Sequence, residues 1–227
     1  MAFDRRRGLL ENAIDKIERY NQVCLHYNLV ADAVYRELRE SRRPFSVNYE
    51  PYIIAALISF DMGRMMGEGL LQKYDINAGG FATKLHQKLQ QIKQHLYSII
   101  DSNIIDTDID LYAIAIMHSY SILANKGHEG FDLNRDFHVG ATKILHFLNP
   151  ELFMIIDANI ARTLRNYFEI PYRNTPQPGY SGELYVRSLK VVKDLIVEYG
   201  ERNFRSLENQ SPIMRIFDKI AFASTNH

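Results

Sequence analysis

The sequence predicts an all-α protein, a single globular domain of about eight or nine orthogonally packed helices over residues 1–227. Apolar residues recur at spacings of three and four along most of the chain, which is the period of an amphipathic helix. Strand signals are confined to two short stretches, residues 45–47 and 153–156. The expected helices differ in length, which favours a globular array over a bundle of long parallel helices.

The first half of the chain contains four expected helices. One apolar stripe predicts a helix from about residue 5 to 26, and Val34 and Leu38 belong to a short second helix. Pro51 suits the first turn of a third helix, because its missing N–H is harmless there. This third helix extends to about residue 73 and is apolar nearly all round.

The fourth helix carries a heptad-like apolar stripe of five residues, Leu85, Leu89, Ile92, Leu96 and Ile99. Such a stripe can face a second copy of the chain in a homodimer, or it can be internal core. We expect internal core, because a chain of this size must bury most of its apolar stripes within itself.

Five further helices are expected over about residues 109–125, 134–148, 158–168, 181–200 and 211–223. Asn134, Asp157 and Ser181 are placed to cap three of them, since their side chains accept from free N–H groups. Gly200 is placed to end the helix that Ser181 begins. Three prolines and two glycines predict a loop over residues 171–182.

Composition excludes several functional classes. The 27 basic and 27 acidic residues give no net charge, which argues against a basic nucleic-acid-binding coat but permits a local basic patch. Cys24 is the only cysteine, so internal disulfides, cysteine-rich zinc modules and four-cysteine iron–sulfur clusters are excluded. We expect no cofactor. The longest apolar run, residues 53–58, is too short to span a membrane, and we expect a cytoplasmic protein.

Two groups of residues suggest metal ligands and fail on spacing. Asp106, Asp108 and Asp110 alternate like a calcium loop, but Leu111 and Met117 stand where that loop needs glycine and glutamate. Helix-start caps explain the aspartates better. The eight histidines form no ligand pair of useful spacing, so we expect no metal site.

A basic row lies on the expected helix 181–200. Arg187, Lys190 and Lys193 are three residues apart and opposite its apolar stripe. Together with Arg162, Arg165 and Arg173 upstream they could form a basic face. The alternative is an ordinary solvated helix face.

The most informative stretch is residues 138–168. A helix begins near Val139-Gly140 and ends at Asn149-Pro150, and an apolar segment then leads to Asp157 at the next helix start. The spacing Phe153, Asp157, Asn159, Ile160, Arg162 and Leu164 resembles that of the helix-hairpin-helix DNA glycosylase superfamily, especially its adenine-mismatch and endonuclease III-type members.

This resemblance implies a catalytic role for Asp157, whose carboxylate would stabilise a cationic sugar or activate water. Backbone N–H groups near His138 and Gly140 would hold a phosphate at a helix start, with Asn159 and Arg162 also contacting DNA. The target base would be flipped out of the duplex.

Two further features of the resemblance concern position. Lys143 lies one position beyond the lysine of the lyase-competent members, a position taken here by Thr142. Asp157 is equally well placed as a helix cap, so its position in the sequence leaves both roles open.

Two functional hypotheses follow. The first is a DNA-binding, base-excision glycosylase-like protein. The second is a non-catalytic helical protein that associates with itself or with a partner. The glycosylase hypothesis predicts that Asp157 lies in an open, positively lined cleft beside the helix start at Gly140.

Overall fold

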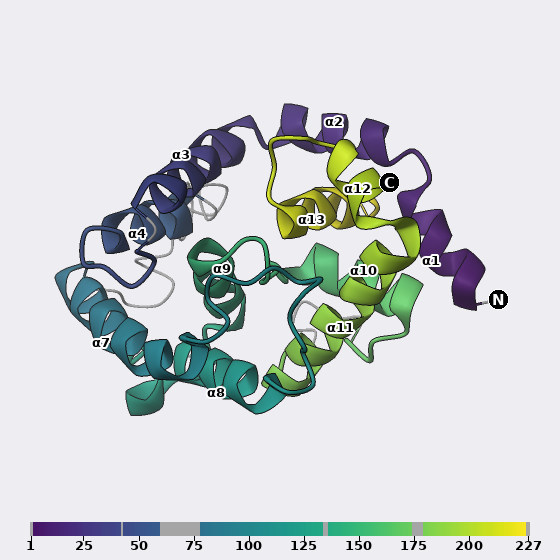
Figure 1. Ribbon diagram of the computed structural model, residues 1–227. Coiled ribbons are helices and arrows are strands. Elements are labelled where there is room, and N and C mark those ends of the chain that lie inside the picture. The colour runs from purple at the N-terminus through teal and green to yellow at the C-terminus, as the bar shows by residue number, and fades with distance from the viewer. Residues whose placement is uncertain (1, 42, 60–77, 134–135, 174–178, 226–227) are drawn as a thin grey trace.

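The computed structural model describes residues 2–41, 43–59, 78–133, 136–173 and 179–225 (Figure 1). These residues form eleven α-helices and one 3₁₀ turn, with no strand among them, which confirms the predicted all-α class. The helices before the centre of the chain are α1 (Ala2–Leu10), α2 (Ala13–Val23), α3 (Leu25–Ser41), α4 (Glu50–Ser59), α7 (Ala78–Leu96) and α8 (Ala113–Ala124). After the turn η1 (Gly127–Glu129) come α9 (His138–Leu148), α10 (Ala158–Phe168), α11 (Gly182–Tyr199), α12 (Glu201–Ser206) and α13 (Ile213–Ala223).

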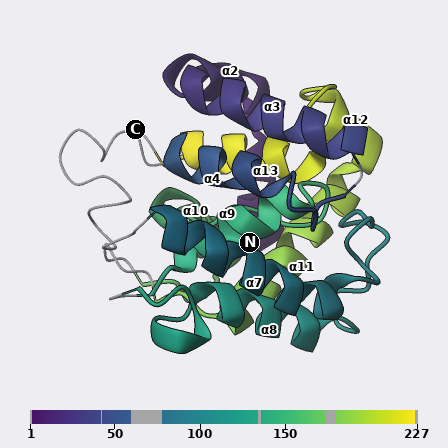
Figure 2. The same cartoon turned by 90° about the vertical axis from the view of Figure 1, so that its left-hand side faces the viewer.

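Helix α9 is the centre of the molecule. Figure 1 shows it surrounded by the other helices, and Figure 2 shows it between α2 and α3 at one end and α7 and α8 at the other. Eight of its eleven residues are buried. One hydrophobic core extends around it and contains residues from Leu9 in α1 to Ala221 in α13. A helix that is apolar on nearly every side can only be stable in such a position.

The single helix predicted over residues 5–26 is wrong. Asn12 adopts a left-handed conformation with φ 54° and separates α1 from α2, and Cys24 separates α2 from α3. Asparagine tolerates this conformation better than most residues do. Because the apolar spacing continues across the break, the pattern did not reveal it. The break lets α1 pack against α10 while α2 packs against α13.

The two strand candidates are also wrong. Residues 45–47 lie in turns, and residues 153–156 are extended but have no partner strand in the described parts of the chain. Helix α12 was not predicted, because six residues are too few to show a helical period. Helix α4 covers the start of the predicted 51–73 helix; residues 60–73 and Asn134 lie outside the described residues.

The predicted caps of α10 and α11 are confirmed. The Asp157 side chain accepts from the N–H groups of Asn159 and Ile160, and Ser181 Oγ accepts from Leu184 N. Gly200 ends α11 with φ 88°. Helix ends depend on local hydrogen bonds, so short polar residues in the sequence reveal them well.

The heptad-like stripe is internal core, as expected. All five of its residues are at most 1% exposed, and the first four lie on α7. The stripe is therefore covered within the chain. Among the described helices, none has the length and apolar character that crossing a bilayer requires.

Candidate functional site

The segment from residue 149 to 156, which we call the bridge, crosses the interior from the end of α9 to the start of α10. Residues 152–156 are all buried, so their backbone polar groups need partners. Two carbonyl groups accept from side chains. His146 Nδ1 lies 2.7 Å from the Phe153 carbonyl oxygen, and the Tyr185 hydroxyl donates to the Met154 carbonyl at 3.1 Å.

The next two backbone N–H groups of the bridge also pair with side chains. Ile155 N donates to Asp218 Oδ2 at 3.3 Å, and Ile156 N donates to Thr142 Oγ1 at 3.0 Å. Side chains from α9, α11 and α13 therefore replace the partner strand. They determine where the chain emerges, and the first residue to emerge is Asp157.

His146 links the bridge to α3 through hydrogen bonds at both of its ring nitrogens. A carbonyl oxygen only accepts, so Nδ1 carries the proton, and Nε2 accepts from the Tyr35 hydroxyl at 2.6 Å. Burial, together with the nearby Arg215, lowers the pKa of His146 to about 3. His146 is therefore neutral at ordinary pH and structural in role.

Behind the bridge lies a buried ionic cluster from α13. The Arg215 guanidinium donates to the Tyr20 hydroxyl and to Asn28 Oδ1, both at 2.9 Å. Burial opposes its charge, but Tyr20, Tyr35 and Asp218 more than compensate and raise the pKa of Arg215. Burial raises the pKa of Asp218 well above its ordinary value, and Arg215 opposes that rise. Asp218 Oδ1 is buried without a hydrogen-bond partner.

The two carboxylate oxygens of Asp157 lie in different environments. Both capping bonds, from Asn159 N and Ile160 N, reach Oδ1 at 2.9 Å. Oδ2 accepts no hydrogen bond from the described part of the chain, and the residue is only half-buried. Because Ile156 is bonded to Thr142, this carboxylate lies beside the first half of α9. Capping thus occupies one oxygen and leaves the second available.

Gly140 allows close packing at the start of α9. A Cβ on this residue would lie 2.0 Å from the Phe137 ring, so only glycine fits under that ring. Gly140 is itself buried. The His138 ring stacks on Tyr120, and its Nδ1 lies 3.0 Å from the Tyr120 hydroxyl. Burial lowers the pKa of His138, although Asp136 opposes this effect.

The other predicted site residues lie on the outer parts of α9 and α10. Lys143 is half-buried on α9, next to Thr142. Asn159 is half-buried and Arg162 is exposed, and their spacing of three places them on one face of α10. Arg162 makes no ion pair with a described residue. Asp157 lines neither of two cavities in the described part of the chain, one between α7 and α8 and one at the other end of α9.

One ion pair and one further hydrogen bond join the basic row of α11 to the aspartate-containing segment before α8. Lys190 pairs with Asp110, and Lys193 donates to the Thr107 carbonyl at 2.7 Å. Asp108 Oδ1 accepts from the N–H groups of Asp110 and Leu111, as a helix-start residue does. Within the described ranges no group of three metal-ligating side chains converges. The α11 row is therefore occupied in packing α11 onto the segment before α8.

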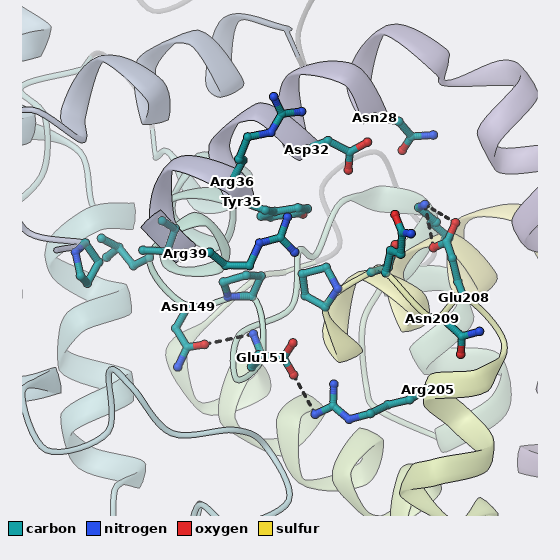
Figure 3. Close-up of a pocket in the computed structure, with 18 of the residues that line it drawn as sticks. Asn28, Asp32, Tyr35, Arg36, Arg39, Asn149, Glu151, Arg205, Glu208 and Asn209 are labelled. Atoms are coloured by element: carbon teal, nitrogen blue, oxygen red, sulfur yellow. Dashed lines mark hydrogen bonds and ion pairs between the residues drawn. The ribbon is translucent and has the colours of Figure 1, made fainter. Parts of the chain in front are cut away.

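A cavity of about 1070 Å³ lies at the other end of α9. Its walls come from α3, from the turn after α9 and from the segment that joins α12 to α13 (Figure 3). Sequence analysis missed it, because the contributing residues are remote in sequence and on α3 look like a solvated helix face. No signal in the sequence could have brought these three segments together.

No protein-family model, no curated protein and no solved structure gave a significant match to this chain.

Proposed function

We propose that this protein binds DNA and cleaves the N-glycosidic bond of a flipped base, with Asp157 as the reacting carboxylate. One observation carries the proposal. Asp157 caps α10 through Oδ1 alone, and Oδ2 has no hydrogen-bond partner among the described residues. The residue can therefore retain its capping role and still present an oxygen to a substrate.

The chemistry needs little more than a positioned negative charge. Cleavage of the bond between base and sugar builds positive charge on the sugar, and a carboxylate beside it stabilises that charge. The same oxygen can take a proton from the water that attacks the sugar. The rigid bridge supports either role, because four side-chain bonds precede Asp157 and limit its movement.

DNA contacts are proposed at the outer face of α10 and at the start of α9. Arg162 is exposed on that face and makes no ion pair with a described residue, and the first N–H groups of α9, near His138, can face a phosphate. The protein has no net charge, so its affinity for DNA should be modest and strongly dependent on salt. Lys143 is proposed as a neighbour of the reacting sugar.

The decisive experiment is a titration of fluorescent duplexes, intact and carrying mismatched or damaged bases, at several salt concentrations. The proposal predicts binding at low salt. The logarithm of the affinity should fall with the logarithm of the salt concentration, with a slope that corresponds to a few phosphate contacts. It also predicts release of a base from one duplex class. Absence of binding to every duplex at low salt would exclude it.

The second candidate, a non-catalytic association protein, is favoured by one surface. Val23, Leu25 and Leu29 are 60–68% exposed where α2 meets α3. Sedimentation at increasing concentration tests this candidate. A homodimer through these residues would be supported if the wild-type protein sediments with twice the mass of 26.4 kDa and the Leu29→Lys variant sediments with the single mass. A single mass throughout would contradict it.

A further inference from the structure

The cavity at the end of α9 is separate from Asp157. It is bordered by Leu148, which ends α9, and by residues 149–151 after it, whereas Asp157 lies beside the first half of the same helix. Its volume of about 1070 Å³ is in the range of sites that hold small organic ligands. A role for it is therefore independent of the proposed DNA chemistry.

The side of the cavity away from α3 has charges that are already paired. Arg205 bonds Glu151 at 2.9 Å and Glu201 at 2.8 Å. Lys219 is buried and bonds Glu208 at 2.7 Å. Burial raises the pKa of Glu208, but hydrogen bonds from Lys219 and its neighbours outweigh this and leave the pKa below its ordinary value. Because these charges are paired with one another, this wall has little charge available to bind a ligand.

The α3 side is different. Asp32, Arg36 and Arg39 follow the spacing i, i+4, i+7 and lie on one face of α3 toward the cavity. Neither arginine makes an ion pair with a described residue, whereas Glu151, Arg205, Glu208 and Lys219 are all paired. Asp101, which is exposed, also lines the cavity. Figure 3 shows Arg39 reaching into the cavity alongside Tyr35, while Arg36 extends on the other side of Tyr35 in this view. Both arginines are exposed, so their guanidinium groups can turn toward one anion with several oxygens.

Asp32 provides the opposite charge on the same face. Its carboxylate makes no ion pair with a described residue. Asp32 and Lys219 both line the cavity, and the Asp32 charge opposes the lowering of the Lys219 pKa by burial. Seven residues of helix separate Asp32 from Arg39, which is about 10 Å along the axis. This separation matches a ligand with an anionic group at one end and a hydrogen-bond donor at the other.

Between these two polar ends the walls are apolar. Leu148, Pro150 and Pro212 line the cavity opposite α3. They offer flat surfaces for a ring, while Asn209 and Gln210 provide amide groups at the rim. We infer that this cavity binds a nucleoside 5′-monophosphate whose base carries an exocyclic amine, with the phosphate at Arg36 and Arg39 and the amine at Asp32.

Calorimetric titration of the full chain with adenosine 5′-monophosphate tests the inference. We expect saturable binding at ligand concentrations up to about 1 mM. Arg36→Gln and Arg39→Gln should each weaken it by roughly tenfold or more, because each removes a charge-assisted bond to phosphate. Arg202→Gln is the matched control, since Arg202 is exposed on α12 and outside the cavity, and it should change nothing.

Two comparisons test the orientation of the ligand. Inosine 5′-monophosphate lacks the amine and should bind more weakly than the adenosine nucleotide, and Asp32→Asn should reduce that difference. Inorganic phosphate should compete with both nucleotides. The inference is overturned if the adenosine nucleotide does not bind, if Arg36→Gln and Arg39→Gln bind like wild type, or if adenosine without phosphate binds equally well. Circular dichroism verifies that each variant is folded.

Discussion

Two carboxylates accept from backbone N–H groups within the same short stretch of chain, and they differ in burial and in the charge beside them. Asp218 accepts from Ile155 N and is 1% exposed, with Arg215 beside it. Asp157 accepts from the two N–H groups that begin α10 and is half-buried. Each has one oxygen without a hydrogen bond, but the spare oxygen of Asp218 is buried.

The difference separates a structural carboxylate from a candidate reactive one. A buried charge with one side unsatisfied is costly, and it persists because the surrounding fold holds Arg215 next to it. A half-exposed carboxylate is solvated at little cost and can exchange water for a substrate. Changes at the two sites should therefore have opposite effects on activity and on stability.

The largest expected effect is on activity at Asp157. Asp157→Asn retains an oxygen for the cap, so the free energy of unfolding should change by less than about 1 kcal/mol. It removes the charge that the proposed reaction needs, so base release should fall by roughly 10²-fold or more. Thermal melts measure the change in stability, and single-turnover assays measure the change in base release. Activity that survives the change would contradict the assignment of Asp157.

Arg215→Met, in contrast, should mainly reduce stability. It leaves the Tyr20 hydroxyl and Asn28 without their buried donor and Asp218 without the positive charge beside it, which should cost about 3–5 kcal/mol of stability. Urea unfolding measures this loss. Arg202→Met, on the exposed face of α12, is the control and should stay within about 0.5 kcal/mol. Equal stability of the two variants would show that the cluster is not needed for folding.

The pH dependence of stability should reveal His146. Its folded pKa of about 3 lies below its ordinary value, so the unfolded chain binds a proton that the folded protein excludes. This contribution to stability is complete above about pH 6.5 and is lost as pH falls toward 3, at roughly 1.4 kcal/mol per pH unit.

The control for this effect is His146→Gln, which cannot titrate. The variant should be less stable at neutral pH but should have a shallower decline between about pH 6.5 and 4. Urea unfolding at a series of pH values gives both curves. Parallel curves would mean that His146 does not contribute to the acid sensitivity of the protein.

The smallest effect concerns the start of α9. Gly140→Ala places a methyl group against the Phe137 ring, which should cost about 1–3 kcal/mol through overpacking. Gly8→Ala is matched to it, because no neighbouring atom lies within 4 Å of that Cβ, and it should be neutral or stabilising by up to about 1 kcal/mol. Adding Phe137→Leu to Gly140→Ala should recover part of the loss. If Gly140→Ala instead leaves stability intact and weakens DNA binding, Gly140 contacts phosphate as the resemblance implies.

Local features of the fold were predictable from single residues. Asp157, Ser181 and Gly200 mark helix ends correctly, because a cap depends on atoms within a few residues. The burial of the α7 stripe was predictable from chain length and apolar spacing. The break at Asn12 was not, because the same apolar period serves one long helix or two short ones.

The candidate sites show the same limit. Asp157 was found from its spacing, but nothing in the sequence showed that its cap uses one oxygen only. The cavity, and the pairing of Lys190 with Asp110, join segments far apart in the chain. Periodicity records which face of a helix is apolar but not which other helix covers it.

The sequence by itself therefore determined the all-helical class, most helix positions and the caps, since these depend on period and on local hydrogen bonds. Only the tertiary structure decided that residues 153–156 are a buried bridge without a partner strand, held by side chains from three helices. The reason is physical. Buried backbone groups accept any partner of suitable geometry, and which partner is near depends on how the helices pack.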